Sequence, residues 1–417
     1  MPMITVIINY ILKFFHWFDV PSHGLVFLNK GYRSLDLLYC YQGLLKTKQS
    51  FLCLNNNSLT LIEGRGDDLA QYYFIPKILY LINAPANLLY IERFQKLFYA
   101  FIIFISFLII LYGLKILYKK LNFINIILII FLYFFSLYSL STYTFNFFII
   151  SFIPLTIYFI NKYLINKNKY YILYFISIGF IVSLSNSFRF FSGTGLLLFI
   201  STYIIFIKGK ELLLKNKFYI IISFFIFINS INFYFDYIMQ KRNEWLIANN
   251  YSQVVKDSWT KHTIWSDLYI GLAYVQPNKY KIGWEDQFAI DKANNEVGYK
   301  KWTYNTMDSE MEEIIKKEVI RILKDDPFFI FQNITKKAIK VIITIFYSIN
   351  IGLLFIFINK TDKKIIISSL VTILFYSIPP ILVWPDPRYF LGAICMSVLL
   401  TIFLINDFLV FRQTQSA

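Results

Sequence analysis

Long apolar runs, separated by short polar segments, dominate the chain from residue 97 onward. A helix of about 20 apolar residues is long enough to cross the ~30 Å hydrocarbon core of a bilayer. The apolar stretch that ends near residue 160 is too long for one crossing, and we place a break in it at the polar patch Ser141–Thr144. The spans that this pattern predicts lie at 97–118, 122–140, 145–161, 170–187, 194–208, 217–235, 341–359, 365–383 and 389–407.

A shorter apolar run near the start of the chain adds one more element. Residues 4–18 carry Lys13 and His16 and predict an uncut anchor or an interfacial helix. We therefore expect an all-α polytopic membrane protein, a bundle of about ten transmembrane helices, with surface helices in the first external loop and a small external α-rich block. The expected parts are 1–96 (anchor and first external loop), 97–235 (helix bundle), 236–340 (extracytoplasmic block) and 341–417 (C-terminal spans).

Composition and charge support a membrane protein and argue against a nucleic-acid partner. Hydrophobic residues make up 57% of the chain and charged residues 16%, with a mean hydropathy of +0.54, outside the range of a soluble domain of this length. The net charge of +16 is concentrated in lysine clusters between the apolar runs, as in cytoplasmic loops. These clusters are Lys119–Lys120; Lys162, Lys167 and Lys169; Lys208, Lys210, Lys215 and Lys217; and Lys360, Lys363 and Lys364.

The lysine clusters also predict which polar segments share a face. If the clusters are cytoplasmic, alternation of the spans places the remaining polar segments on the opposite side. These segments are 63–68, 187–194, 236–340 and 384–389. The Lys-, Asn-, Ile- and Phe-rich composition is typical of an AT-rich bacterial genome, so we expect an inner-membrane protein whose active face is extracytoplasmic.

An acidic turn is the first candidate for chemistry. Asp67 and Asp68 lie in the glycine-punctuated segment Glu63–Asp68. Neighbouring carboxylates can raise one another's pKa until one accepts a proton near neutrality, so either could be a general base. Two carboxylates could also hold a divalent metal ion, although they do not specify one. The alternative is an exposed turn whose acids are only solvated.

Cysteine usage leaves two possibilities open. Cys40 and Cys53 could form a disulfide if their loop lies on an oxidising face, or both could be free buried thiols. Cys395 lies in an apolar run and is expected to pack there.

Cations on the same predicted face are candidates for holding a phosphate. Arg189 lies in the segment 186–195 and Arg388 in the last outer turn, 384–389. Arginine suits bidentate capture of phosphate oxygens, and we add Arg65 and Lys77 as further candidates. An isolated arginine at a membrane boundary can equally be a snorkelling residue. Outer lysines that could attract an anionic lipid headgroup, or simply anchor a helix end, are Lys336, Lys337 and Lys340.

The external block combines aromatic and acidic residues ahead of one clear helix. The segment Asp308–Pro327 has an apolar stripe, and Ser309 with Glu312 forms a capping-box pattern. The aromatic and acidic residues upstream suit a surface that binds a ringed, hydroxylated acceptor. They are His262, Trp265, Asp267, Tyr269, Glu285 and Asp286. Alternatively, the aromatic residues and the histidine fill the core of a small cap domain.

The order of these motifs resembles a known superfamily. The acidic pair is followed by Tyr73, by Pro76–Lys77 and by Glu92–Arg93, then by many spans, a late soluble block with an amphipathic helix, and Arg388–Tyr389. This order resembles the GT-C integral membrane glycosyltransferases, which include the protein O-mannosyltransferases and the bacterial lipid A aminoarabinose transferases. The resemblance covers most of the chain. The weak first span and the 262–286 cluster depart from the general pattern and point to a subfamily with its own acceptor.

The resemblance implies transfer of a sugar from a polyprenyl-phosphate-linked donor to a glycan, lipid or protein acceptor, with inversion. In such enzymes a first-loop acid, here Asp67 or Asp68, acts as the base or positions the acceptor, and the outer cations would stabilise the leaving phosphate. One alternative is an O-antigen polymerase or ligase, which would use external arginines without the acidic turn. Another is a lipid-linked glycan flippase, for which ionisable residues at mid-membrane depth are expected.

Overall fold

The computed structural model describes most of the chain outside its N-terminus and several connections. The described residues are 32–55, 58–62, 68–119, 122–138, 140–166, 170–206, 214–251, 254, 264–302, 309–347, 362–385 and 389–415. The expected N-terminal element at 4–18 lies outside them. The described part is almost entirely helical, as the apolar periodicity predicts, and has one two-stranded antiparallel sheet.

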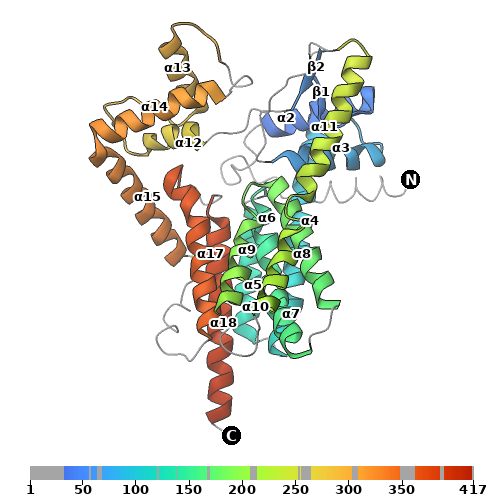
Figure 1. Cartoon of the computed structure of the whole chain (residues 1–417), viewed down its shortest axis with the longest axis vertical. Helices are drawn as coiled ribbons and strands as arrows, with labels where there is room; N and C mark the ends of the chain where they lie inside the picture. The colour runs from blue at the N-terminus through green and yellow to red at the C-terminus, as the bar shows by residue number, and fades with distance from the viewer. Residues whose placement is uncertain are drawn as a thin grey trace.

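The elements keep the chain order shown in Figure 1. They are α2 (Tyr32–Thr47), β1 (Leu52–Asn55), β2 (Ser58–Leu61), α3 (Leu69–Leu81), α4 (Leu88–Tyr118), α5 (Phe123–Tyr138), α6 (Thr144–Ser151), α7 (Ile153–Asn166), α8 (Tyr170–Phe188), α9 (Thr194–Ile205), α10 (Leu214–Phe225), α11 (Ser230–Ala248), α12 (Ile264–Gly271), η2 (Leu272–Tyr274), α13 (Asp286–Val297), α14 (Ser309–Asp325), α15 (Pro327–Tyr347), α17 (Lys363–Leu382) and α18 (Leu391–Gln415).

Six described helices are long and apolar enough to cross a membrane. They cover Leu88–Tyr118, Thr144–Leu164, Tyr170–Phe188, Phe218–Ala248, Lys363–Leu382 and Leu391–Leu409. Two shorter apolar helices cover Phe123–Leu137 and Thr194–Ile205. The structure thus confirms an all-α multi-pass membrane protein. It does not confirm the expected count of about ten spans, and the expected span 341–359 is described only as far as Tyr347.

The expected break in the long apolar stretch is confirmed. Helix α5 ends at Tyr138, residues 141–143 form a turn, and α6 begins at Thr144. By contrast, α11 continues past residue 235, where we placed the end of a span, as far as Ala248. Residues 236–248, which we had assigned to the external block, therefore continue the helix that begins in the preceding apolar segment.

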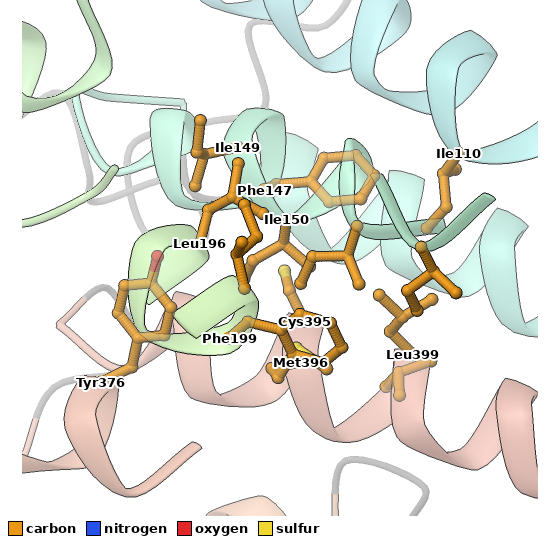
Figure 2. Packing of buried hydrophobic residues seen from close by; sticks show 14 of the residues in the cluster. Ile110, Phe147, Ile149, Ile150, Leu196, Phe199, Tyr376, Cys395, Met396 and Leu399 are labelled. Carbon is orange, nitrogen blue, oxygen red and sulfur yellow. The ribbon is translucent and has the colours of Figure 1, made fainter. Parts of the chain in front are cut away.

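Helix α18 is the central helix of the bundle. Its apolar window is 89% buried, against 28–72% for the other candidate spans. A helix that is apolar on all sides is buried either in lipid or among other helices, and the high buried share of α18 shows that neighbouring helices surround it. Cys395, Met396 and Leu399 of α18 pack against residues of α4, α6 and α9 (Figure 2). Cys395 is fully buried in this packing, as its apolar run predicts.

Two polar lobes lie at the same end of the bundle (Figure 1). The first lobe consists of α2, β1, β2, α3 and the upper part of α11, and the second consists of α12 to α14 and the upper part of α15. The second lobe has a hydrophobic core of its own, whereas the core of the first lobe continues into the bundle through Tyr99, Phe145 and Phe188. The first turn of α4 meets the first lobe, and Lys119 directly follows the other end of this helix. The last turn of α17 meets the second lobe, and Lys363 begins this helix at its other end. Both lysines therefore lie at the end of the bundle away from the lobes.

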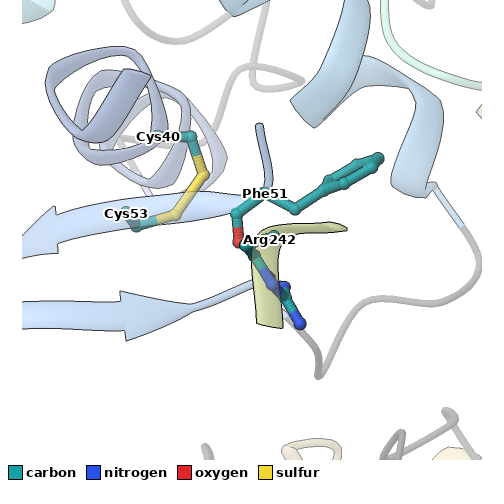
Figure 3. Close-up of a disulfide and its surroundings, with 4 residues drawn as sticks. All are labelled: Cys40, Phe51, Cys53 and Arg242. Atoms are coloured by element: carbon teal, nitrogen blue, oxygen red, sulfur yellow. Dashed lines mark hydrogen bonds between the residues drawn. A yellow bond between two sulfur atoms is a disulfide. The ribbon is translucent and has the colours of Figure 1, made fainter. Parts of the chain in front are cut away.

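The first lobe is held together by a disulfide and a buried arginine (Figure 3). The bond between Cys40 and Cys53 joins α2 to β1. Gly43 lets α2 lie directly on β1, because a Cβ there would be 1.9 Å from the carbonyl oxygen of Leu52. Arg242 of α11 is 1% exposed and donates from Nη1 to the carbonyl oxygen of Phe51 at 3.1 Å, which ties α11 to the lobe.

The second lobe contains the expected amphipathic helix as α14. Glu312 of this helix is buried, and its two carboxylate oxygens accept hydrogen bonds from the backbone N–H groups of Trp265 and Ser266, at 3.1 Å each. The hydroxyl of Ser266 donates to it as well. Glu312 thus caps the N-terminus of α12, where a carboxylate is favoured by the helix dipole. The capping-box pattern with Ser309 did not indicate this long-range contact.

We expect the thiol count to reveal the disulfide. Denatured protein that has not been reduced should react with maleimide at one cysteine, Cys395, and reduced protein should react at all three. Intact-mass spectrometry of the labelled chain checks the count. Three labelled cysteines in unreduced protein would contradict the bond.

Candidate functional site

The structure describes eight of the twelve candidate site residues. Asp67, Arg65, His262 and Arg388 lie outside the described residues. The other candidates lie in or beside elements of the two lobes and at one turn of the bundle. They are Asp68, Lys77, Arg189, Trp265, Asp267, Tyr269, Glu285 and Asp286.

Asp68 is enclosed by the first lobe. It directly precedes α3, is 0% exposed, and accepts a hydrogen bond at Oδ2 from the side-chain amide of Gln71 at 2.8 Å. Gln71 in turn accepts from the hydroxyl of Tyr99 at 3.0 Å and from the amide of Gln95 at 3.3 Å. The carboxylate is therefore part of a buried polar network between α3 and α4. Its burial favours a structural role and does not favour direct contact with an acceptor.

Lys77 is a residue of α3 and lies near the contact of this helix with α11. Its Nζ donates to the hydroxyl of Tyr73 at 2.9 Å and lies 4.5 Å from the centre of the same ring. The hydroxyls of Tyr73 and Tyr234 also form a hydrogen bond, which joins α3 to α11. The half-buried ammonium group is thereby held at the junction of the two helices.

Arg189 follows directly after α8 and stacks on an aromatic ring. Its guanidinium carbon lies 4.1 Å from the centre of the Tyr143 ring, within the range of a cation–π interaction. The Tyr143 ring meets the edge of the Tyr389 ring, with centroids 5.3 Å apart. The structure thus brings together the segment of Arg189, the turn before α6 and the residue that follows Arg388.

The turn that carries Arg189 is fixed by hydrogen bonds with residues of α8 and α17. Asn186 accepts a hydrogen bond from the backbone N–H of Gly193 at 2.8 Å. The hydroxyl of Tyr376, on α17, donates to the carbonyl oxygen of Ser192. The backbone that presents Arg189 is therefore attached to the bundle at two points.

An aromatic stack connects the two cations. Phe74, which follows Tyr73, stacks on Phe188, which precedes Arg189, with ring centroids 5.7 Å apart. Phe188 also lies parallel to Phe145 of α6 at 4.1 Å. We call this cluster the aromatic rim; Phe74, Lys77 and Arg189 are its partly exposed members. It consists of Tyr73, Phe74, Lys77, Tyr143, Phe188 and Arg189.

The aromatic members of this rim were not among the predicted site residues. Tyr143 lies in the polar patch where we placed a break between two spans, but the patch was not among the segments that we assigned to the outer face. Phe74 and Phe188 lie in apolar runs that contain many phenylalanines. Nothing in their spacing distinguishes these rings from those that face lipid.

In the second lobe the candidate residues divide between core and surface. Tyr269 is 5% exposed within the core of this lobe, and burial together with the nearby Glu318 raises its pKa to about 12. Trp265 packs against the same core. These two positions favour the alternative in which aromatic residues fill a cap domain. Glu285, which is exposed, directly precedes α13, and Asp286 begins that helix.

Lys337 attaches the second lobe to the bundle. It is 1% exposed, and its Nζ donates to the carbonyl oxygens of Gly271 at 3.1 Å, Leu382 at 2.8 Å and Val383 at 3.3 Å. The last two oxygens end α17, where a cation is favoured by the helix dipole. Lys337 is therefore an internal tie, in contrast to the headgroup contact that we considered for it.

Aromatic rings complete this junction. Trp384, two residues after the end of α17, packs against Trp284 at a centroid distance of 4.3 Å and against Tyr274 at 5.2 Å. The segment that leads to Arg388 and Tyr389 is therefore in contact with the second lobe.

Within the described part of the chain, no group of three or more His, Cys, Asp or Glu residues could hold a metal ion. The acidic turn that we considered for a metal lies mostly outside that part. In comparisons with family models, with curated proteins and with solved structures, nothing matched the chain.

We expect Lys337→Met to destabilise the protein by at least about 2 kcal/mol, because each buried carbonyl left without its donor costs about 1–3 kcal/mol. The matched control is Lys336→Met on the exposed side of the same helix. Thermal unfolding of both variants in detergent measures the difference. Equal melting temperatures for the two variants would contradict the tie.

Proposed function

We propose that this protein is a membrane glycosyltransferase. It would move a sugar from a polyprenyl-phosphate-linked donor to a glycan, lipid or protein acceptor. The observation that carries the proposal is the aromatic rim, where Lys77 and Arg189, far apart in sequence, flank the Phe74–Phe188 stack. The motif order that resembles the GT-C superfamily gives independent support.

The aromatic rim suits a ligand that has both an anionic group and an apolar part. A guanidinium group can bind two phosphate oxygens at once, and an ammonium group acts as a point charge. Both groups already lie against tyrosine rings, so less side-chain freedom is lost when a phosphate binds. Phe74, which is partly exposed, offers an apolar contact for a prenyl tail or a sugar face, and the buried Phe188 supports its ring from behind.

In the proposed reaction the cations stabilise the phosphate as it leaves the sugar carbon. Asp67 removes the proton of the acceptor hydroxyl, and direct displacement inverts the anomeric centre. Asp68, held by Gln71, fixes the start of α3 beside it. Arg388, which directly precedes Tyr389 in the sequence, is assigned to the same phosphate because Tyr389 meets Tyr143.

The active face is proposed to be extracytoplasmic, in a bacterial inner membrane. A disulfide between Cys40 and Cys53 is typical of an oxidising compartment. Lys119 and Lys363 lie at the ends of helices away from both lobes, which agrees with the excess of lysine in cytoplasmic loops.

A second candidate is a polymerase or ligase of the O-antigen type. The burial of Asp68 favours it, because such an enzyme would use the outer arginines without a base from the acidic turn. The two candidates differ in what they require of Asp67.

We expect Asp67→Asn to reduce transfer by about 10²–10⁴-fold, because loss of general-base catalysis costs that much. Polyprenyl-phosphate-linked sugars should then accumulate in cells that carry only this variant, and mass spectrometry of lipid extracts measures them. Glu63→Gln, in the same segment, is the control for the loss of one charge. Unchanged transfer by an expressed Asp67→Asn protein would favour the polymerase or ligase.

We expect Arg189→Lys to weaken donor use about tenfold, since lysine keeps the charge but loses the planar fork and much of the stacking on Tyr143. The KM for the lipid donor in a purified transfer assay should rise more than kcat falls. Arg321→Lys, on the exposed face of α14, should leave both constants unchanged. If the KM for the lipid donor is unchanged in Arg189→Lys, Arg189 does not bind the donor phosphate and only anchors the helix end at the membrane boundary.

A further inference from the structure

Helix α15 exposes an apolar stripe along its whole length. The exposed side chains recur at helical spacing and are between 44% and 70% exposed. They are Phe328, Phe331, Ile339, Ile342, Ile343 and Phe346. This helix is not one of the six candidate spans.

The opposite face of α15 is committed to the interior. Phe329, Asn333, Lys337 and Val341 are buried along it. The side-chain oxygen of Asn333 accepts from the backbone N–H of Val275 at 3.2 Å, and Lys337 binds the end of α17. Because these contacts fix the rotation of the helix, the apolar stripe must face outward.

The preceding helix shows what a water-exposed face of this lobe looks like. The outer side of α14 carries charged residues in ion pairs, such as Arg321 with Glu318 and Asp325, and Lys316 with Glu313. Helix α14 has one large apolar side chain among its exposed residues, Leu323, whereas on α15 such side chains recur from Phe328 onward. The second lobe therefore has a charged face on α14, which suits water, and directly beside it an apolar face on α15, which does not.

Charge indicates what covers the stripe. Helix α15 contains no aspartate or glutamate, and Lys336 and Lys340 are exposed one turn apart at the edge of the stripe. A basic edge beside an apolar face is typical of helices at the surface of an anionic membrane. The helix also packs beside α17, a candidate span whose Leu370, Leu374 and Ile378 are exposed, so the two apolar surfaces adjoin.

We propose that the outward face of α15 lies in the bilayer from Phe328 onward and that Lys336 and Lys340 bind anionic lipid headgroups. The second lobe would then rest on the membrane through α15, with α14 above it in water. This inference does not depend on the proposed transferase activity.

Nitroxide labels can report which solvent each face meets. Single cysteines would be placed at Phe331 and Ile342 on α15 and, as controls, at Glu313 and Leu323 on α14, in the full chain in vesicles of phosphatidylglycerol and phosphatidylcholine. The native cysteines do not interfere, because Cys40 and Cys53 are bonded and Cys395 is buried.

We expect oxygen to relax the α15 labels more than an aqueous nickel complex does, and the reverse for α14. Labels on α15 that are relaxed mainly by nickel, or shielded from both reagents as by a second protein chain, would overturn the proposal.

The lysines are tested by lipid preference. Spin-labelled phosphatidylglycerol and phosphatidylcholine report the fraction of each lipid held by the protein. The double variant Lys336→Gln/Lys340→Gln should lower the preference for phosphatidylglycerol by about tenfold, whereas Lys317→Gln/Lys324→Gln on α14 should not. An unchanged preference in the first variant would exclude these lysines as the headgroup site.

Discussion

The cost of burying a charge shapes both lobes. Asp68, Arg242, Glu312 and Lys337 are at most 7% exposed, and a buried charge is tolerated only where other groups bond to it. Each of three of these charges bonds to the backbone of another element: Arg242 to the segment before β1, Glu312 to α12, and Lys337 to α12 and to the end of α17. Arg242 also donates to the side chain of Asn243 on its own helix. Satisfying these charges therefore also fixes how the elements sit against one another.

Apolar periodicity was enough to predict much of the bundle. The expected spans at 170–187 and 365–383 match α8 and α17 closely, and the amphipathic segment after Asp308 is α14, because burial in lipid or in a core leaves a clear pattern. The continuation of α11 could not be predicted, since its polar half is stabilised by tertiary contacts such as that of Arg242 with Phe51. Of the two roles considered for Lys337, the headgroup contact was wrong for the same reason: its sequence neighbours suggested a surface, whereas its hydrogen-bond partners are distant in the sequence.

The candidate site shows the same division. Alternation of the spans predicted that Arg189 lies on the outer side, and the break between two spans at Tyr143 was predicted as well, but only the structure joins the two through a ring contact. That Phe74 meets Phe188 depends on how α3 lies on α8, which no local pattern records. Asp68 is the opposite case, because an acid in a glycine-rich turn is usually solvated, and here Gln71 and the lobe enclose it.

The ring of Tyr376 also limits how the bundle can move. It lies against Gly195 of α9 and Gly392 of α18, where an added Cβ would come within 2.2 Å and 2.6 Å of the ring. The ring of Tyr376 thus fills the space left by the two glycines, so α9, α17 and α18 cannot rotate about their axes independently of one another. A larger residue at either glycine would therefore have to displace the Tyr376 ring, and with it the hydrogen bond from its hydroxyl to the carbonyl oxygen of Ser192.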